Sequence, residues 1–164
     1  MKEIGHFIGG KHVAGTSGRT SDVFNPATGE VQATVALASE AEIRAAVENA
    51  KQAQPKWAAT NPQRRARVFF KFVELLNTHL DELAVLLSSE HGKTVDDSKG
   101  DIIRGLEVCE FVCGIPHLSK GEFTEGAGPA IDMYSIRQPV GVGAGITPFN
   151  FPGMIPMWMF APAI

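Results

Sequence analysis

Apolar residues recur every three or four positions through the middle of the chain. Residues 63–91 contain neither glycine nor proline, and this period over such a length is typical of an amphipathic helix. Asn61 followed by Pro62 fits an N-cap and a first helical position. The pattern therefore predicts a helix that turns one face to a core. The residues of that face are Phe69, Phe72, Val73, Leu76, Leu80, Leu83, Ala84 and Leu87.

Two further helices are predicted, one on each side of this stretch. Ser39 and Glu42 form a capping box, in which each side chain can bond to the backbone N–H of the other residue, so a helix should begin there and run towards Trp57. The residues expected on its buried face are Ile43, Val47 and Ala50. The second helix covers residues 95–112. Its inward residues should be Ile103, Leu106, Cys109 and Val112 or Cys113.

Short strand patterns lie before and after the helices. Gly9 and Gly10 separate two short apolar stretches and predict a two-residue hairpin. The other strand candidates are residues 22–25, 31–35, 130–137 and 140–144. The order of strands, helices and strands, without an internal repeat, predicts a single α/β or α+β unit.

Residues 140–164 carry no charged side chain. This length would suit a membrane span, but the glycines and prolines within it would interrupt helical hydrogen bonding in lipid. We expect instead a buried strand, an irregular loop and the start of a core helix. We also expect these elements to be covered by further residues of a longer polypeptide.

The composition excludes several classes of function. An apolar share of 44% and a net charge of -3 argue against intrinsic disorder. No clustered positive charge is present, so we expect neither nucleic acid nor a membrane surface as a partner. Cys109 and Cys113 lie four residues apart on a predicted helix and fit reduced core thiols in a cytoplasmic protein. A metal site or a nucleophile at these cysteines has weaker support, and no metal is expected.

A glycine-rich stretch near residue 141 invites comparison with a dinucleotide-binding loop. Gly141, Gly143 and Gly145 would let the backbone approach a pyrophosphate. Ile146 stands where that fingerprint requires its third glycine, and no helix is predicted to start there. Close packing of two elements on small residues is the preferred interpretation.

Asn150 is the strongest candidate for chemistry. It lies between two aromatic rings and two prolines, which should hold it rigidly in a dry pocket. A fixed amide donor in low dielectric is what a developing oxyanion requires. The alternative is that Asn150 caps the helix that follows, and the local pattern leaves both open.

Three motifs in order carry a family resemblance. Residues 141–160 read GVGAGITPFNFPGMIPMWMF, residues 24–30 read FNPATGE, and residues 90–93 read EHGK. With these motifs the chain resembles the aldehyde dehydrogenase superfamily over nearly its whole length. Residues 64–67, 104–107, 114–116 and 149–152 narrow the resemblance to the CoA-acylating methylmalonate-semialdehyde dehydrogenases.

The resemblance implies an α/β fold of which residues 1–164 form an incomplete N-terminal portion. Residues 39–118 would form a helical layer, and residues 139–164 would begin a Rossmann-like cofactor domain with its first strand. The β segments at residues 1–38 and 119–138 would join the oligomerisation region of a homodimer or homotetramer.

The resemblance also implies a reaction. In this family a cysteine thiolate attacks an aldehyde, hydride passes to NAD, and in this branch CoA removes the acyl group. Asn150 would donate to the oxyanion, while Ile146, Thr147 and Phe149 would line the cofactor cleft. The nucleophile and the general base would lie beyond residue 164. An aldehyde dehydrogenase that hydrolyses its acyl intermediate, or a noncatalytic helical interaction module, remains an alternative.

Arg104 is the candidate for holding a carboxylate on the substrate. A guanidinium fork can bind a carboxylate through two hydrogen bonds and so keep the aldehyde end at the nucleophile. Asp101 and Glu107 lie three residues away on either side and could instead pair with Arg104 in a purely structural role.

Overall fold

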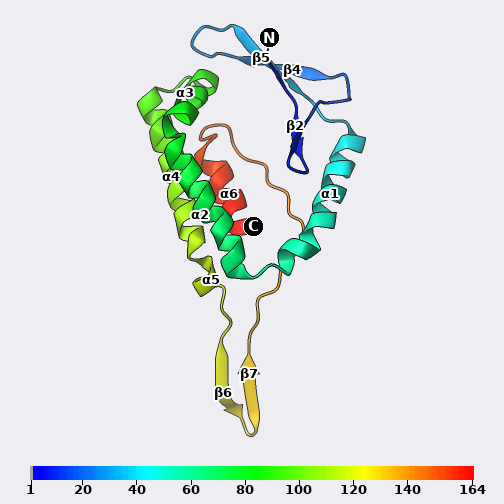
Figure 1. Ribbon diagram of the computed structural model, residues 1–164, viewed down its shortest axis with the longest axis vertical. Helices are drawn as coiled ribbons and strands as arrows, with labels where there is room; N and C mark the ends of the chain where they lie inside the picture. Colours follow the sequence, from blue (N-terminus) through cyan, green and yellow to red (C-terminus); the bar gives the residue numbers. More distant parts are fainter. Residues whose placement is uncertain (1) are drawn as a thin grey trace.

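A three-stranded sheet lies near the N-terminus of the computed structural model, which describes residues 2–164. Its central strand β5 (Val31–Ala36) pairs antiparallel with β4 (Thr20–Phe24) and parallel with β1 (Lys2–Ile4) (Figure 1). The strand predictions for residues 22–25 and 31–35 agree with β4 and β5 to within two residues.

The predicted hairpin is confirmed. β2 (His6–Ile8) and β3 (Lys11–Val13) pair antiparallel across Gly9 and Gly10. Both glycines have positive φ angles, +60° and +76°, and a two-residue turn that matches the strand twist requires this conformation.

The predicted helix starts are confirmed. α1 (Glu40–Ala58) begins at the capping box, where Ser39 N donates to Glu42 Oε2 at 2.8 Å and Glu42 N donates to Ser39 Oγ at 3.3 Å. α2 (Pro62–Thr78) begins at Asn61, whose side-chain oxygen accepts from Gln63 N at 2.9 Å. These signals are local hydrogen bonds, which is why the sequence predicts them well.

The predicted burial of α1 is wrong for the described chain. Ile43 is 55% exposed and Val47 47% exposed, and Ala50 is only half-buried. The physical reason is that α1 stands apart from the other helices (Figure 1). No described element covers its apolar face.

The predicted continuous helix over residues 63–91 is two helices. α2 ends at Thr78 and α3 (Leu80–His91) follows after a break at His79. Asn77 Nδ2 donates to the carbonyl of Val73 at 3.0 Å, and Thr78 Oγ1 donates to that of Glu74 at 2.9 Å. Such side chains compete with the backbone and disfavour continuation of a helix.

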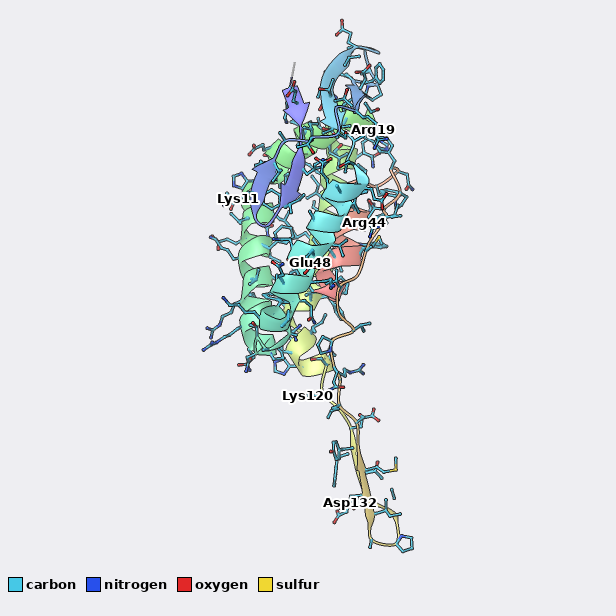
Figure 2. All side chains as sticks on the ribbon, turned by 90° about the vertical axis from the view of Figure 1, so that its right-hand side faces the viewer. Lys11, Arg19, Arg44, Glu48, Lys120 and Asp132 are labelled. Carbon is cyan, nitrogen blue, oxygen red and sulfur yellow. The ribbon has the colours of Figure 1, made fainter. Side chains whose placement is uncertain are left out.

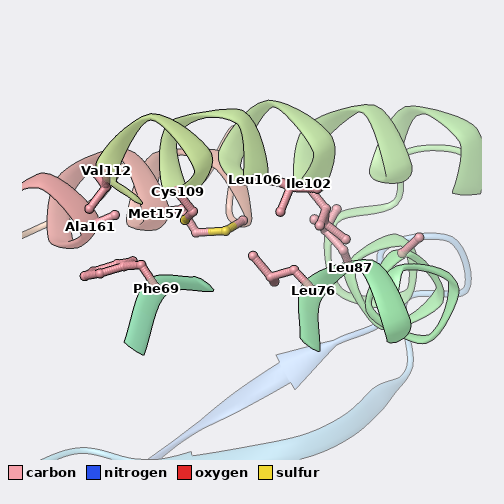
Figure 3. Close-up of a cluster of buried hydrophobic side chains, with 10 residues drawn as sticks. Phe69, Leu76, Leu87, Ile102, Leu106, Cys109, Val112, Met157 and Ala161 are labelled. Atoms are coloured by element: carbon pink, nitrogen blue, oxygen red, sulfur yellow. The ribbon is translucent and has the colours of Figure 1, made fainter. Parts of the chain in front are cut away.

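The core lies between α2, α3 and α4 (Val95–Cys113), with the short α5 (Ile115–Leu118) beyond it. Leu106, Cys109 and Val112 are buried as predicted, but Ile103 is 39% exposed and its neighbour Ile102 takes the inward position. Ile102 lies one full turn before Leu106 and therefore shares its face. The side chains labelled in Figure 3 include Phe69, Leu76, Leu87, Ile102, Leu106, Cys109, Val112, Met157 and Ala161.

α6 (Met154–Ala163) packs along α4 and completes this core, so the predicted start of a core helix is confirmed. Close approach depends on Gly105, where an added methyl group would clash with Met157 Cε and lie 3.2 Å from Met154 Cα. Within residues 2–164, no helix has the length and apolarity needed to cross a bilayer.

β6 (Phe123–Gly128) and β7 (Ile131–Tyr134) form a two-stranded ribbon that projects from the body, with Lys120 at its base and Asp132 near its tip (Figures 1 and 2). The strand predicted over residues 130–137 is thus shortened. The strand predicted over residues 140–144 is wrong for the described chain, where this stretch is coil. A strand needs a neighbour to bond with, and none of the described strands lies alongside it.

Candidate active-site loop

Asn150 lies in the coil that joins β7 to α6, within a segment of residues 149–153 that we call the Asn150 loop. Asn150 is exposed. Residues 2–164 therefore do not enclose it in the dry pocket that the sequence predicted. The candidate cofactor residues share this exposure: Ile146 is 93% exposed, Phe149 is 67% exposed, and Thr147 is exposed too.

The two rings beside Asn150 contact residues at the end of α3 and just after it. The ring of Phe149 stacks on that of His91, with centroids 5.3 Å apart and planes at 24°. Lys93 Nζ lies 4.6 Å from the centroid of the Phe151 ring, within the range of a cation–π contact. The rings therefore fix the backbone of the loop, and among residues 2–164 the exposed Asn150 side chain makes no hydrogen bond.

Gly92 brings two of the recognised motifs together. It ends α3 with a left-handed φ of +85°, a conformation that glycine adopts without steric cost. An added methyl group there would lie 2.8 Å from Pro26 Cγ. The motif at residues 24–30 thus packs against the motif at residues 90–93, which itself contacts the Asn150 loop.

Asp101 anchors the other end of the loop. Its side chain is fully buried, and Oδ1 accepts from Met154 N at 2.6 Å while Oδ2 lies 3.0 Å from Lys93 Nζ. The first turn of α6 is therefore bonded by Asp101, and its N-cap residue is Gly153. The capping alternative for Asn150 is wrong.

Arg104 is exposed on α4. Its carbonyl accepts from Trp158 Nε1 at 3.1 Å. Among residues 2–164 its guanidinium group pairs with neither Asp101 nor Glu107, and the Asp101 carboxylate pairs with Lys93 instead. The structural alternative for Arg104 is thus not observed, and the guanidinium group is available to a ligand.

The two cysteines are reduced. Burial raises the pKa of the Cys109 thiol to about 11 and also raises that of Cys113, which lowers the thiolate fraction and hence nucleophilic reactivity. Cys113 Sγ donates to the carbonyl of Cys109 at 3.4 Å. Across the described residues, no group of three histidine, cysteine, aspartate or glutamate side chains is arranged to hold a metal ion.

The glycine-rich stretch does not open a helix, since α6 begins only at Met154. The dinucleotide-fingerprint interpretation is therefore not supported. Within the described chain, residues 140–149 make no backbone hydrogen bond, so their N–H and C=O groups remain available beside exposed apolar side chains. These properties fit one wall of a cleft for a nucleotide cofactor, which takes apolar contacts and a few backbone bonds.

The sequence prediction missed Lys93, Asp101 and His91 as residues that hold the loop. One available signal was the face of α4 that contains Ser98, Asp101 and Gly105, which recur at helical spacing in register with Cys109. This register places a carboxylate on the buried face, where it needs a partner.

Comparison with known proteins places these features in a family. Residues 12–164 match the aldehyde dehydrogenase family. Malonate-semialdehyde dehydrogenase of Pseudomonas aeruginosa is 45% identical over 164 residues, covering all of this chain and 33% of the relative. The mitochondrial acylating methylmalonate-semialdehyde dehydrogenase of Arabidopsis thaliana is 49% identical over 161 residues, covering 98% of this chain and 26% of the relative.

A crystal structure from Sinorhizobium meliloti 1021, complexed with NAD and assigned to methylmalonate-semialdehyde dehydrogenase, is similar over 99% of this chain and 33% of its own. The TM-score is 0.95 and the sequence identity 81%. The chain spans between about a quarter and a third of the length of these relatives. The predicted fold class, the α/β N-terminal part of an aldehyde dehydrogenase, is confirmed. The chain belongs to the aldehyde dehydrogenase family.

Proposed function

We propose that this chain is the N-terminal part of an NAD-dependent, CoA-acylating dehydrogenase of methylmalonate semialdehyde and malonate semialdehyde. The products would be propionyl-CoA and acetyl-CoA, each with loss of CO2. The observation that carries the proposal is the 81% identity, over 99% of the chain, to the NAD-complexed structure from Sinorhizobium meliloti. Two reduced thiols suit a cytoplasmic location.

In this reaction a thiolate outside the described chain adds to the aldehyde carbon, and the carbonyl oxygen becomes an alkoxide. The Asn150 carboxamide would donate a hydrogen bond to that oxygen as negative charge develops. NAD supplies the hydride acceptor when it is bound. Loss of hydride from the former aldehyde carbon would leave a thioester on the thiolate sulfur. The substrate carboxylate would leave as CO2, with a proton taking its place, and the acyl group would pass to CoA, which restores the thiolate.

Two observations support this role for Asn150. Its side chain is exposed, and the N-cap of α6 is another residue, Gly153. The backbone around it is held on both sides, by the Phe149 stack on His91 and by the hydrogen bond that Met154 N donates to Asp101. A donor on a fixed backbone provides the preorganisation that electrostatic stabilisation of an oxyanion needs.

We also propose that the β6–β7 ribbon contacts a second copy of the chain in a dimer or tetramer. An isolated two-stranded ribbon is marginally stable in water. Phe123 and Tyr134 are 66% and 76% exposed on it. Contact with a partner would remove these rings from water, which is favourable.

The proposal is tested with the complete polypeptide that contains this chain. Purified protein is given methylmalonate semialdehyde and NAD, with and without CoA, and NADH and the acyl product are measured. We expect CoA-dependent NADH formation and a CoA thioester. A free acid formed without CoA would indicate the hydrolytic branch of the family, and no NADH would indicate a noncatalytic module.

The role of Asn150 is tested in the same assay with Asn150→Ala. We expect kcat to fall by roughly 10² to 10³, the scale found when one oxyanion donor is removed. Asn49→Ala, at an exposed position on α1, is the matched control and should retain wild-type kcat. An Asn150→Ala enzyme with unchanged kcat would contradict the role.

A further inference from the structure

Lys93 and Asp101 form a buried ion pair directly behind the Asn150 loop. Lys93 Nζ lies 3.0 Å from Asp101 Oδ2, and the two side chains are 10% and 0% exposed. Removing two charges from water costs free energy that their attraction often fails to recover, so a buried pair is weak evidence for stability. Stability alone therefore does not explain why this ion pair is buried behind the loop.

Among the described residues, the other contacts of the Lys93 ammonium group are with the Asn150 loop. An ammonium group has three donors, and Nζ makes a long hydrogen bond of 3.4 Å to the carbonyl oxygen of Asn150. The same nitrogen lies 4.6 Å from the centroid of the Phe151 ring. One lysine thus contacts Asp101 and two consecutive loop residues.

The second oxygen of Asp101 holds the other end of the loop. Oδ1 accepts from Met154 N at 2.6 Å, at the N-terminus of α6, where the helix dipole favours a negative charge. The ion pair therefore bonds the carbonyl of residue 150 and the N–H of residue 154. It therefore holds the backbone at two points four residues apart, Asn150 and Met154.

We infer that Lys93 and Asp101 are positioning residues for Asn150: the ion pair sets where the loop backbone lies, and the backbone sets where the Asn150 amide points. This inference rests on the proposed oxyanion role of Asn150. It follows because, among residues 2–164, Asn150 uses only its carbonyl in a bond to another residue. A displacement of about 1 Å at a catalytic group can reduce the rate by roughly 10²-fold.

The test uses the complete enzyme and a pair of substitutions that leaves no charge unpaired, Lys93→Met with Asp101→Asn. The amide at position 101 can still accept from Met154 N, so α6 retains its first-turn bond. We expect kcat to fall roughly 10- to 100-fold, with a change in KM of less than about threefold. The control is Lys99→Met with Asp81→Asn, which removes an exposed ion pair of 2.6 Å between Lys99 on α4 and Asp81 on α3 and should retain wild-type kcat.

A double-mutant cycle with Asn150→Ala separates positioning from general stabilisation. If the pair acts through Asn150, its replacement in the Asn150→Ala background should change kcat by less than about twofold. An equal loss in both backgrounds, or wild-type kcat for the paired variant, would overturn the inference. Wild-type kcat for Asn150→Ala alone would instead refute the proposed function of Asn150, so the two failures are distinguishable.

Lys93→Arg provides a second variant if the paired substitution does not fold. Arginine retains the charge opposite Asp101, but its planar, longer side chain cannot place a donor at the same point. Circular dichroism of the Lys93→Arg enzyme should show a wild-type fold. Its kcat should be lower than wild type when Asn150 is present, and in the Asn150→Ala background the substitution should leave kcat unchanged. Undiminished kcat in the folded Lys93→Arg enzyme would rule the positioning role out.

Discussion

Among residues 2–164, the guanidinium group of Arg104 on α4 forms no ion pair. Arg104 is exposed, whereas the carboxylate of Asp101, three residues earlier on the helix, is buried and bonded to Lys93. The planar fork of arginine matches a carboxylate through two parallel hydrogen bonds, a geometry that lysine cannot reproduce. These properties suit the free carboxylate of a semialdehyde substrate.

Replacement of Arg104 by Leu in the complete enzyme should raise KM for methylmalonate semialdehyde by roughly 10- to 100-fold, since a hydrogen bond to a charged group contributes about 1.5 to 3 kcal/mol. KM for propanal, which has no carboxylate, should change much less. Steady-state kinetics with both substrates measures the difference. Arg44→Leu, on the exposed face of α1, is the control, and equal effects of Arg104→Leu on the two substrates would refute the role.

At the level of single residues, the sequence indicated which residues form the candidate site better than it indicated what surrounds them. The flanking aromatic rings and prolines predicted that Asn150 would be held rigidly, and the contacts of Phe149 and Met154 on either side of it agree with a fixed backbone. They did not reveal that Phe149 would stack on His91, 58 positions earlier in the chain, and leave Asn150 exposed. The docking site of a ring depends on tertiary contacts, which local pattern does not contain.

At the level of elements, the start of α1 is held by one carboxylate. Glu42 accepts from the backbone of Ser39 and from that of Thr16, and these bonds lower its pKa to about 2. A carboxyl group with a depressed pKa in the folded state stabilises the fold above its unfolded pKa. That contribution is lost as the pH falls from about 4.5 towards about 2.

We therefore expect Glu42→Gln to reduce amide-exchange protection in the first turn of α1 at pH 7. The difference from wild type should narrow as the pH falls below about 4.5. Hydrogen exchange followed by mass spectrometry, expressed as protection factors, measures both effects. Glu40→Gln removes an exposed partner of Arg44 and should leave protection unchanged. A pH-independent difference for Glu42→Gln would show that charge is not the cause.

The elements that the sequence predicted correctly are those with local causes. Caps at Ser39 and Asn61 and the glycine hairpin depend on neighbouring residues. Periodicity identifies an apolar face but not what covers it, so the burial of α1 was predicted wrongly. For the same reason residues 140–144 carried a strand pattern without the neighbouring strand that would complete a ladder.

At the scale of the whole molecule, the described chain leaves large apolar surfaces uncovered on separate elements. The β6–β7 ribbon is the most isolated, projecting from the helical layer in both views (Figures 1 and 2). Phe123 and Tyr134 are directly opposite in its register, so their rings lie on one face. Exposed apolar patches of this kind mark interaction surfaces.

Replacement of both rings by threonine, Phe123→Thr with Tyr134→Thr, should weaken self-association of the complete protein. Threonine retains strand propensity and forms favourable cross-strand pairs, so the ribbon itself should persist. Two buried aromatic anchors at about 2 kcal/mol each correspond to roughly a thousandfold in Kd. Light scattering coupled to size exclusion should therefore report a smaller species at micromolar concentration. Glu48→Lys on α1 (Figure 2) is the control, and an unchanged mass for the paired variant would place the interface elsewhere.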